Sequence, residues 1–372
     1  MKVKYCFLAF FVICSLVFSS CDVFFDKDNG NETMVIVAPL VQTKWDQNSP
    51  YNDLFPLVNG RRVVTDCTTT AWAQIKAYHR YPTRGSGQST LVLPANIEVP
   101  LVDLNVAYDW NNMLNIYTNS ATEQQRNAVA TLMYHIALAR GSTGSNIIAT
   151  VNNFGYDRSI QRHQRVYYND FEWEALIKVQ LDNRLPVFYS SGREGGSHSF
   201  IVDGYDNNGK FHINWGWSGR DDGWYSLNAL TPNTVHYDRD HVITINIKPD
   251  EGSVGSNVMA LNIFSSTVTS VLHNEPFEID VQVRSMGIFP GGEIGAVLVD
   301  INNNITVIRS LSLVAINSNS SWNRPMSNCR VPDTVPKGQY RLRIVTRIDD
   351  GDWVVAMRAM PDVPNSIDFE VR

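Results

Sequence analysis

The stretch VVTDCTTTAWAQIKAYHRYP, residues 63–82, places a cysteine where an extended segment gives way to a helix. Apolar side chains recur at helical spacing from residue 69 to residue 79, directly after polar Asp66 and Cys67. Cys67 is therefore expected at a helix N-terminus, where free N–H groups and the helix dipole stabilise a thiolate. This is one way to activate a cysteine nucleophile. The alternative interpretation is a small buried thiol that only fills space.

A second segment, GREGGSHSFIVDGYD at residues 192–206, brings a histidine to the start of an apolar strand. Gly195 and Gly196 leave room for a substrate backbone to approach, so they and Ser197 are candidate substrate-binding residues. His198 is the candidate general base. The alternative is that His198, like most lone histidines, is a structural residue with its hydrogen bonds satisfied.

A third segment, NWGWSG at residues 214–219, follows a predicted strand. The carboxamide of Asn214 can bond one imidazole nitrogen and so set the tautomer of a catalytic histidine. Trp215 can shield that hydrogen bond from water. The alternative is an aromatic turn that packs against the sheet.

Four segments resemble the streptopain family of papain-like cysteine proteases, over about residues 38 to 235. They are KWDQNSPYNDLFP (44–56), DCTTTAWAQI with YHRYP (66–75 and 78–82), SHSFIVDGYD (197–206) and FHINWGWSGRDDGWYSLNAL (211–230). Their order, Gln, then Cys, then His, then Asn-Trp-Gly-Trp, is the order of that family.

The resemblance implies a papain-like fold and hydrolysis of protein or peptide substrates through a thioester. It makes Cys67 the nucleophile and His198 the base that later protonates the leaving amine. Gln47, together with the Cys67 N–H, would donate to the oxyanion. The Asn-Trp pair would orient and shield the base, and Trp217 would lie along the wall of the cleft.

Two features depart from the family pattern. Asp66 stands where the family usually has glycine, and a carboxylate beside the nucleophile opposes thiolate formation if it points inward. The same carboxylate could instead cap the helix and leave the thiol undisturbed. Thr68 and Thr69 also replace a usual pattern of small residues.

The N-terminus has the layout of an export signal, which we place at residues 1–20. A positive start is followed by a 14-residue apolar run, which is short for a bilayer span. The string VFSSC resembles a bacterial lipobox, so Cys21 is the expected lipidation site and would anchor the chain to the cell envelope, at the outer membrane or cell surface. The alternative is ordinary secretion with Cys21 unmodified.

Residues 21–35 are predicted to form an acidic tether, because they are polar and lack periodicity. The tether is too short to fold as an inhibitory propeptide. If the protease is kept latent, a C-terminal domain would have to inhibit it. We favour the alternative, in which that domain has an accessory role.

Residues 36–250 are predicted to be α+β, with helices first and antiparallel strands after them. Besides the first helix, a capping box at residues 122–125 predicts a helix that stops at Gly141, and Asp170 is the expected cap of a third. The predicted strands are 187–189, 199–202, 210–214 and 224–227.

Residues 255–372 show strand patterns alone and predict an all-β, immunoglobulin-like sandwich. The segment FEIDVQV, residues 277–283, alternates strictly between apolar and polar side chains. Similar runs occur at 261–264, 294–299, 306–311, 340–345, 353–356 and 367–371.

Composition narrows the classes of function. The chain has 372 residues, 44% of them hydrophobic, and a net charge of −6, which fits a globular protein and disfavours a nucleic-acid partner. Its five cysteines show no zinc-like spacing, and no HExxH, phosphate-loop or dinucleotide motif is present. We expect neither a metal nor an organic cofactor, and the sequence does not indicate an oligomeric state.

The sequence thus predicts a secreted, lipid-anchored cysteine endopeptidase. The main alternative is a surface binding or adhesion protein on a protease-like scaffold with weak or no catalysis. A transglutaminase-like acyl transferase is disfavoured, because no acidic third member of its usual catalytic set is evident.

Overall fold

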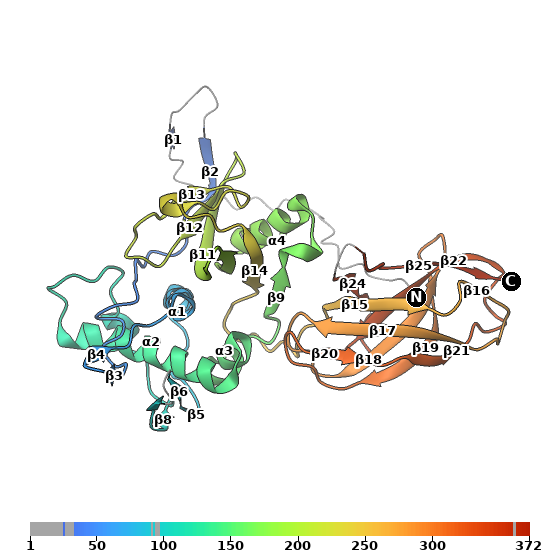
Figure 1. Ribbon diagram of the computed structural model, residues 1–372, viewed down its shortest axis with the longest axis horizontal. Coiled ribbons are helices and arrows are strands. Elements are labelled where there is room, and N and C mark those ends of the chain that lie inside the picture. Colours follow the sequence, from blue (N-terminus) through green and yellow to red (C-terminus); the bar gives the residue numbers. More distant parts are fainter. Residues whose placement is uncertain (1–24, 27–32, 91, 94–96, 360–361) are drawn as a thin grey trace. The chain divides into compact units, whose positions relative to one another are not determined.

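The computed structural model describes residues 25–26, 33–90, 92–93, 97–359 and 362–372 (Figure 1). The chain divides into two compact units, of which one ends at Ser253 and the other begins at Val254. The predicted signal peptide and Cys21 lie outside the described residues. Among those that are described, no helix has both the length and the apolar character needed to cross a bilayer.

An antiparallel sheet organises the first unit, with strands in the order β1-β2-β11-β10-β14-β9 and with β12 and β13 continuing from β11. Its central hairpin, β10 and β11, turns at Glu194-Gly195, where Gly195 has the positive φ of 73° that a tight turn requires. The bounds are β1 (Phe25–Asp26), β2 (Thr33–Val37), β9 (Gln161–Gln164), β10 (Val187–Arg193), β11 (Gly196–Asp206), β12 (Phe211–Asn214), β13 (Gly223–Tyr225) and β14 (Arg239–Ile245).

The helix α1 packs between β11 and α2 (Figure 1). Trp72 of α1 stacks on Phe188 of β10 with ring centroids 5.2 Å apart, which fixes the helix against the sheet. The helices are α1 (Cys67–His79), α2 (Glu123–Thr143), α3 (Asn146–Phe154) and α4 (Asp170–Asp182). Short elements complete the unit: β3 (Leu57–Val58), β4 (Arg61–Arg62), β5 (Gln88–Ser89), β6 (Val92–Leu93), β7 (Ile97–Glu98), β8 (Val102–Asp103), η2 (Trp110–Asn112), η3 (Arg165–Tyr167) and η4 (Pro232–Thr234).

Several predicted boundaries differ from those observed. The capping box of α2 is present, but the helix continues through Gly141 and ends at Gly144, whose left-handed conformation closes it. Asn169 rather than Asp170 caps α4. The predicted tether also overlaps β2, because the strand that starts at Thr33 pairs through Val35 and Val37 with the end of β11.

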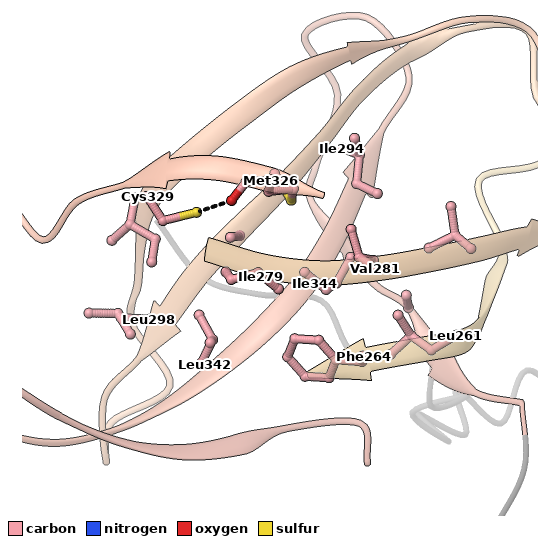
Figure 2. Close-up of a cluster of buried hydrophobic side chains, with 14 of the residues drawn as sticks. Leu261, Phe264, Ile279, Val281, Ile294, Leu298, Met326, Cys329, Leu342 and Ile344 are labelled. Atoms are coloured by element: carbon pink, nitrogen blue, oxygen red, sulfur yellow. Dashed lines mark hydrogen bonds between the residues drawn. The ribbon is translucent and has the colours of Figure 1, made fainter. Parts of the chain in front are cut away.

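The second unit consists of two β-sheets around a shared apolar core (Figure 2). The alternation predicted for residues 277–283 is confirmed in β17, where every second side chain is buried. One sheet contains β15 (Met259–Ser266), β17 (Phe277–Ser285), β20 (Ser321–Asn323), β21 (Met326–Cys329) and β24 (Met357–Arg358). The other contains β16 (Ser270–Val271), β18 (Gly292–Val299), β19 (Ile305–Leu313), β22 (Gly338–Arg347), β23 (Val354–Val355) and β25 (Ile367–Val371). An immunoglobulin-like topology stays a prediction.

Candidate active site

Cys67 is the first residue of α1, and its thiol is partly exposed. Asp66 caps the helix, its side chain accepting from the Thr69 N–H at 2.8 Å. The same carboxylate is held by both terminal nitrogens of the Arg140 guanidinium, one of them at 2.8 Å. Asp66 is therefore a helix cap with a paired charge, which removes the objection to a carboxylate beside the nucleophile.

His198 lies in β11 with only 6% of its surface exposed. Its Nε2 lies 2.9 Å from the main-chain oxygen of Trp215. A carbonyl only accepts, so Nε2 carries a proton and the neutral ring keeps its lone pair on Nδ1. Burial lowers the pKa of His198 to about 4; the Trp215 carbonyl opposes this shift, and Arg193 adds to it. The ring favours the neutral form unless a negative charge, such as a thiolate, lies beside it.

Aromatic rings surround the imidazole. The ring centroid of Trp217 lies 4.7 Å from that of His198, and the fully buried Trp215 ring stacks at 6.1 Å. Tyr237 lies at 5.8 Å on a segment that the sequence did not single out. These rings cover the histidine and place half-buried Trp217 against it.

A side-chain contact brings α1 and β11 together. The hydroxyls of Thr68 and Ser199, the residues directly after Cys67 and His198, are 3.0 Å apart. Burial raises the pKa of Tyr237, Arg193 opposes this shift, and a Cys67 thiolate adds to it. The first turn of α1 and the start of β11 therefore face each other.

The carboxamide of Asn214 is buried but does not make the expected hydrogen bond with His198. Its Nδ2 donates to the Thr43 carbonyl at 2.8 Å, and its Oδ1 accepts from Gln74 Nε2 at 3.0 Å and from the Gly216 N–H at 3.1 Å. The Trp215 carbonyl takes the place that we assigned to Asn214. The reason is steric and chemical: β12 ends at Asn214, whose side chain is already committed to α1 and to the N-terminal segment.

Gln47 lies beside the start of α1. Its carbonyl accepts from the Thr65 N–H at 3.1 Å, and its own N–H donates to the Asp46 carboxylate at 2.6 Å. The other Asp46 oxygen accepts from the Ser218 hydroxyl at 2.7 Å, which joins this segment to the Trp-Gly-Trp turn. The Gln47 side chain is partly exposed.

Gly195, Gly196 and Ser197 are exposed at the tip of the β10–β11 hairpin, which leaves them accessible to a ligand. Sequence reasoning missed Arg140 and Tyr237. Neither lies in a recognised motif, and Arg140 is 74 positions from its partner Asp66, so no local pattern could have found them.

The thiol of Cys329 differs from that of Cys67. It is fully buried in the core of the second unit, where its Sγ donates to the Met326 carbonyl at 3.1 Å (Figure 2). Burial raises the pKa of Cys329 to about 11, so the thiol stays protonated at neutral pH. In the part of the chain that the structure describes, no three His, Cys, Asp or Glu side chains gather where they could hold a metal ion.

Comparisons with known proteins give a consistent result. Residues 45–225 match the Peptidase C10 family. Streptopain from Streptococcus pyogenes is 32% identical over 230 residues, which are 54% of this chain and 58% of streptopain. The thiol protease/hemagglutinin PrtT of Porphyromonas gingivalis is 23% identical over 89% of this chain and 42% of its own length. The active wild-type interpain A cysteine protease of Prevotella intermedia is 30% identical, with a TM-score of 0.53 over 57% of this chain and 95% of that structure.

Proposed function

Since this chain belongs to the Peptidase C10 family of cysteine proteases, we propose that it is a secreted, lipid-anchored endopeptidase that cleaves protein substrates through a thioester on Cys67. The observation that carries the proposal is the bond between His198 Nε2 and the Trp215 carbonyl. It leaves Nδ1 as the basic nitrogen of a shielded histidine, on a strand that faces the N-terminus of the cysteine helix.

The mechanism follows from these positions. His198 Nδ1 takes the proton of the Cys67 thiol, and the sulfur attacks the substrate carbonyl carbon. The Gln47 carboxamide and the Cys67 N–H donate to the resulting oxyanion. The intermediate collapses as the C–N bond breaks, and the imidazolium gives its proton to the leaving amine. Water, deprotonated by His198, then attacks the thioester, releases the acid product and returns the thiol.

The electrostatics suit this sequence of steps. Burial favours a neutral imidazole at rest, and the N-terminus of α1 favours negative charge on the sulfur. When the proton moves, the imidazolium keeps its hydrogen bond to the Trp215 carbonyl, which stabilises the new positive charge. Gly195, Gly196 and Ser197 would contact the substrate backbone, and Trp217 would form part of the wall.

The test is alkylation and cleavage by the mature chain, residues 21–372. We expect iodoacetamide to modify Cys67 well before Cys329, and the chain to cleave casein and a fluorogenic peptide only under reducing conditions. Cys67→Ala should abolish cleavage, whereas the matched variant Cys329→Ala should retain it. Equal labelling of the two thiols, or cleavage that survives Cys67→Ala, would contradict the proposal. A chain that binds surface ligands without cleaving them would favour the adhesion alternative.

Anchoring is a separate part of the proposal. It is supported by the lipobox-like VFSSC string ending at Cys21, and surface exposure fits a protease that acts on external proteins. In bacteria fed an alkyne fatty acid, the wild-type chain should take up the label and partition into detergent. Cys21→Ser should do neither, and a labelled Cys21→Ser chain would refute the assignment of this residue.

A further inference from the structure

Gln74 is a fully buried amide on the nucleophile helix, seven positions after Cys67. That spacing corresponds to about two helical turns, so the two side chains lie on the same side of α1. Both ends of the amide are bonded. Nε2 donates to Asn214 Oδ1 at 3.0 Å, while Oε1 accepts from the Thr43 hydroxyl at 3.0 Å and from the Trp45 N–H at 3.1 Å.

One branch of this network reaches the base. Asn214 Oδ1 accepts from Gln74 and also from the Gly216 N–H. That N–H belongs to the same peptide unit as the Trp215 carbonyl, and this carbonyl is the oxygen that accepts from His198. A peptide unit is planar, so fixing its N–H side fixes the direction of its C=O. Gln74 therefore controls the acceptor that sets the His198 tautomer.

The other branch reaches the oxyanion donor. The Trp45 N–H bonded by Gln74 lies two residues before Gln47, and the Trp45 carbonyl accepts from the Ser218 N–H at 3.1 Å. Segment 43–47 is thus held by α1 on one side and by the Trp-Gly-Trp turn on the other. The Trp-Gly-Trp turn and α1 also lie close together, because a Cβ at Gly216 would lie 3.2 Å from Thr70 of α1.

We propose that Gln74 is a positioning residue that aligns the nucleophile, base and oxyanion donor through one buried amide; this inference rests on the proposed function. An amide has a donor and an acceptor at the two ends of one planar group and carries no charge at any pH in the working range. Methionine at this position keeps the volume and loses all of these hydrogen bonds. Ionised glutamate keeps the acceptor and places a second negative oxygen against Asn214 Oδ1.

A matched control is available in Gln180, which is also buried and lies on α4. Its Oε1 accepts from the Asn246 N–H at 2.9 Å, outside the candidate active site. Gln180→Met loses a buried hydrogen bond without touching the network. A role of Gln74 in stability alone would make Gln74→Met and Gln180→Met behave alike.

The experiment measures Tm, kcat and KM on a fluorogenic peptide, and the pH dependence of Cys67 alkylation, in the mature chain. We expect Gln74→Met to lower kcat by roughly 10- to 100-fold, the size of effect that follows misplacement of reacting groups, with KM little changed and the alkylation midpoint shifted. Gln180→Met should lower only Tm. The inference is overturned if Gln74→Met changes Tm alone.

If Gln74→Met fails to fold, Gln74→Glu tests the inference in its place. A buried carboxyl is protonated at low pH and can donate as the amide does, so activity should approach the wild-type level there and fall as the carboxyl ionises. A pH profile equal to that of the wild type would refute the role of Gln74. If the wild type is active and the Gln74 variants are unaffected, only this inference is overturned. If the wild type neither cleaves peptide nor is alkylated at Cys67, the proposed function is overturned as well.

Discussion

Replacing Lys76 by methionine should stabilise the protein at neutral pH. Lys76 is fully buried on α1, and among the described residues no carboxylate pairs with it. Its Nζ donates to the Thr150 hydroxyl at 3.3 Å and lies 4.6–4.9 Å from the ring centroids of Trp72, Phe154 and Tyr156. The amine is therefore enclosed by aromatic rings without a counter-charge.

Two opposing effects set the magnitude. Burial lowers the pKa of Lys76 well below its usual value of 10.5, because burying an unpaired ion costs several kcal/mol. Contacts with the rings return part of that cost, about 2 kcal/mol in all. Methionine fills a similar volume with no charge to bury. We expect the net gain from Lys76→Met to be about 1–3 kcal/mol near pH 7.

The stability difference between Lys76→Met and the wild type should depend on pH, and the lowered pKa of Lys76 sets its direction. Between its lowered folded-state pKa and about 10.5, this lysine is protonated in the unfolded chain but not in the folded chain, so its contribution to wild-type stability rises with pH over that window. The advantage of Lys76→Met should therefore be largest at low pH and should shrink as the pH rises towards 10.5.

Urea unfolding followed by tryptophan fluorescence at pH 6, 8 and 10 measures this difference. Lys178→Met is the control, because Lys178 is half-buried and has a counter-charge in Glu174, so its loss should change stability by about 1 kcal/mol or less. The reasoning is refuted if Lys76→Met is less stable than the wild type at pH 6 and the difference does not depend on pH. The rings would then stabilise the ammonium by more than its burial costs.

Three further changes probe the site. Gly216→Ala should lower both kcat and Tm, because the residue has a positive φ of 72° and its new Cβ would also lie close to α1. Gly144 also has a positive φ but nothing within 4 Å of a Cβ, so Gly144→Ala should lower Tm alone. Arg193→Gln should raise the NMR titration midpoint of His198 above about 4, since Arg193 helps to lower that pKa; an unchanged midpoint would contradict the electrostatic coupling. Arg140→Gln should slow alkylation of the nucleophile roughly twofold to fivefold at neutral pH by leaving the cap carboxylate unpaired, and an unaltered rate would show that this carboxylate does not influence the thiol.

Local patterns predicted the elements whose stability is local. The alternation of β17 and the capping box of α2 depend on residues within a few positions of each other, and both are present. The strand β14 begins with the charged residues Arg239 and Asp240, which concealed it from an apolar pattern. It forms because its backbone pairs with β10 and β9. Such long-range pairing leaves no signal in the strand itself.

The candidate site likewise has features that the sequence predicts and features that depend on long-range contacts. Sequence order singled out Cys67, His198 and Asn214 as candidates, but not the atoms to which they bond. Asn214 bonds to groups 140 and 171 positions away, and which partner an amide finds depends on packing that no motif encodes. The resemblance supplied the residues of the site, and only the structure could supply the hydrogen bonds between them.

The use of a main-chain oxygen to hold His198 has a physical consequence. A side-chain acceptor can rotate or be replaced, whereas the Trp215 carbonyl is fixed by the peptide plane and by the Gly216 N–H on its other side. The tautomer of the base then depends on the conformation of the whole turn and not on one exchangeable group. The orientation of the His198 ring therefore depends on the contacts that hold this turn against α1. In this chain the contacts that do so are the Asn214 carboxamide, the Gln74 amide and the close approach of Gly216 to Thr70.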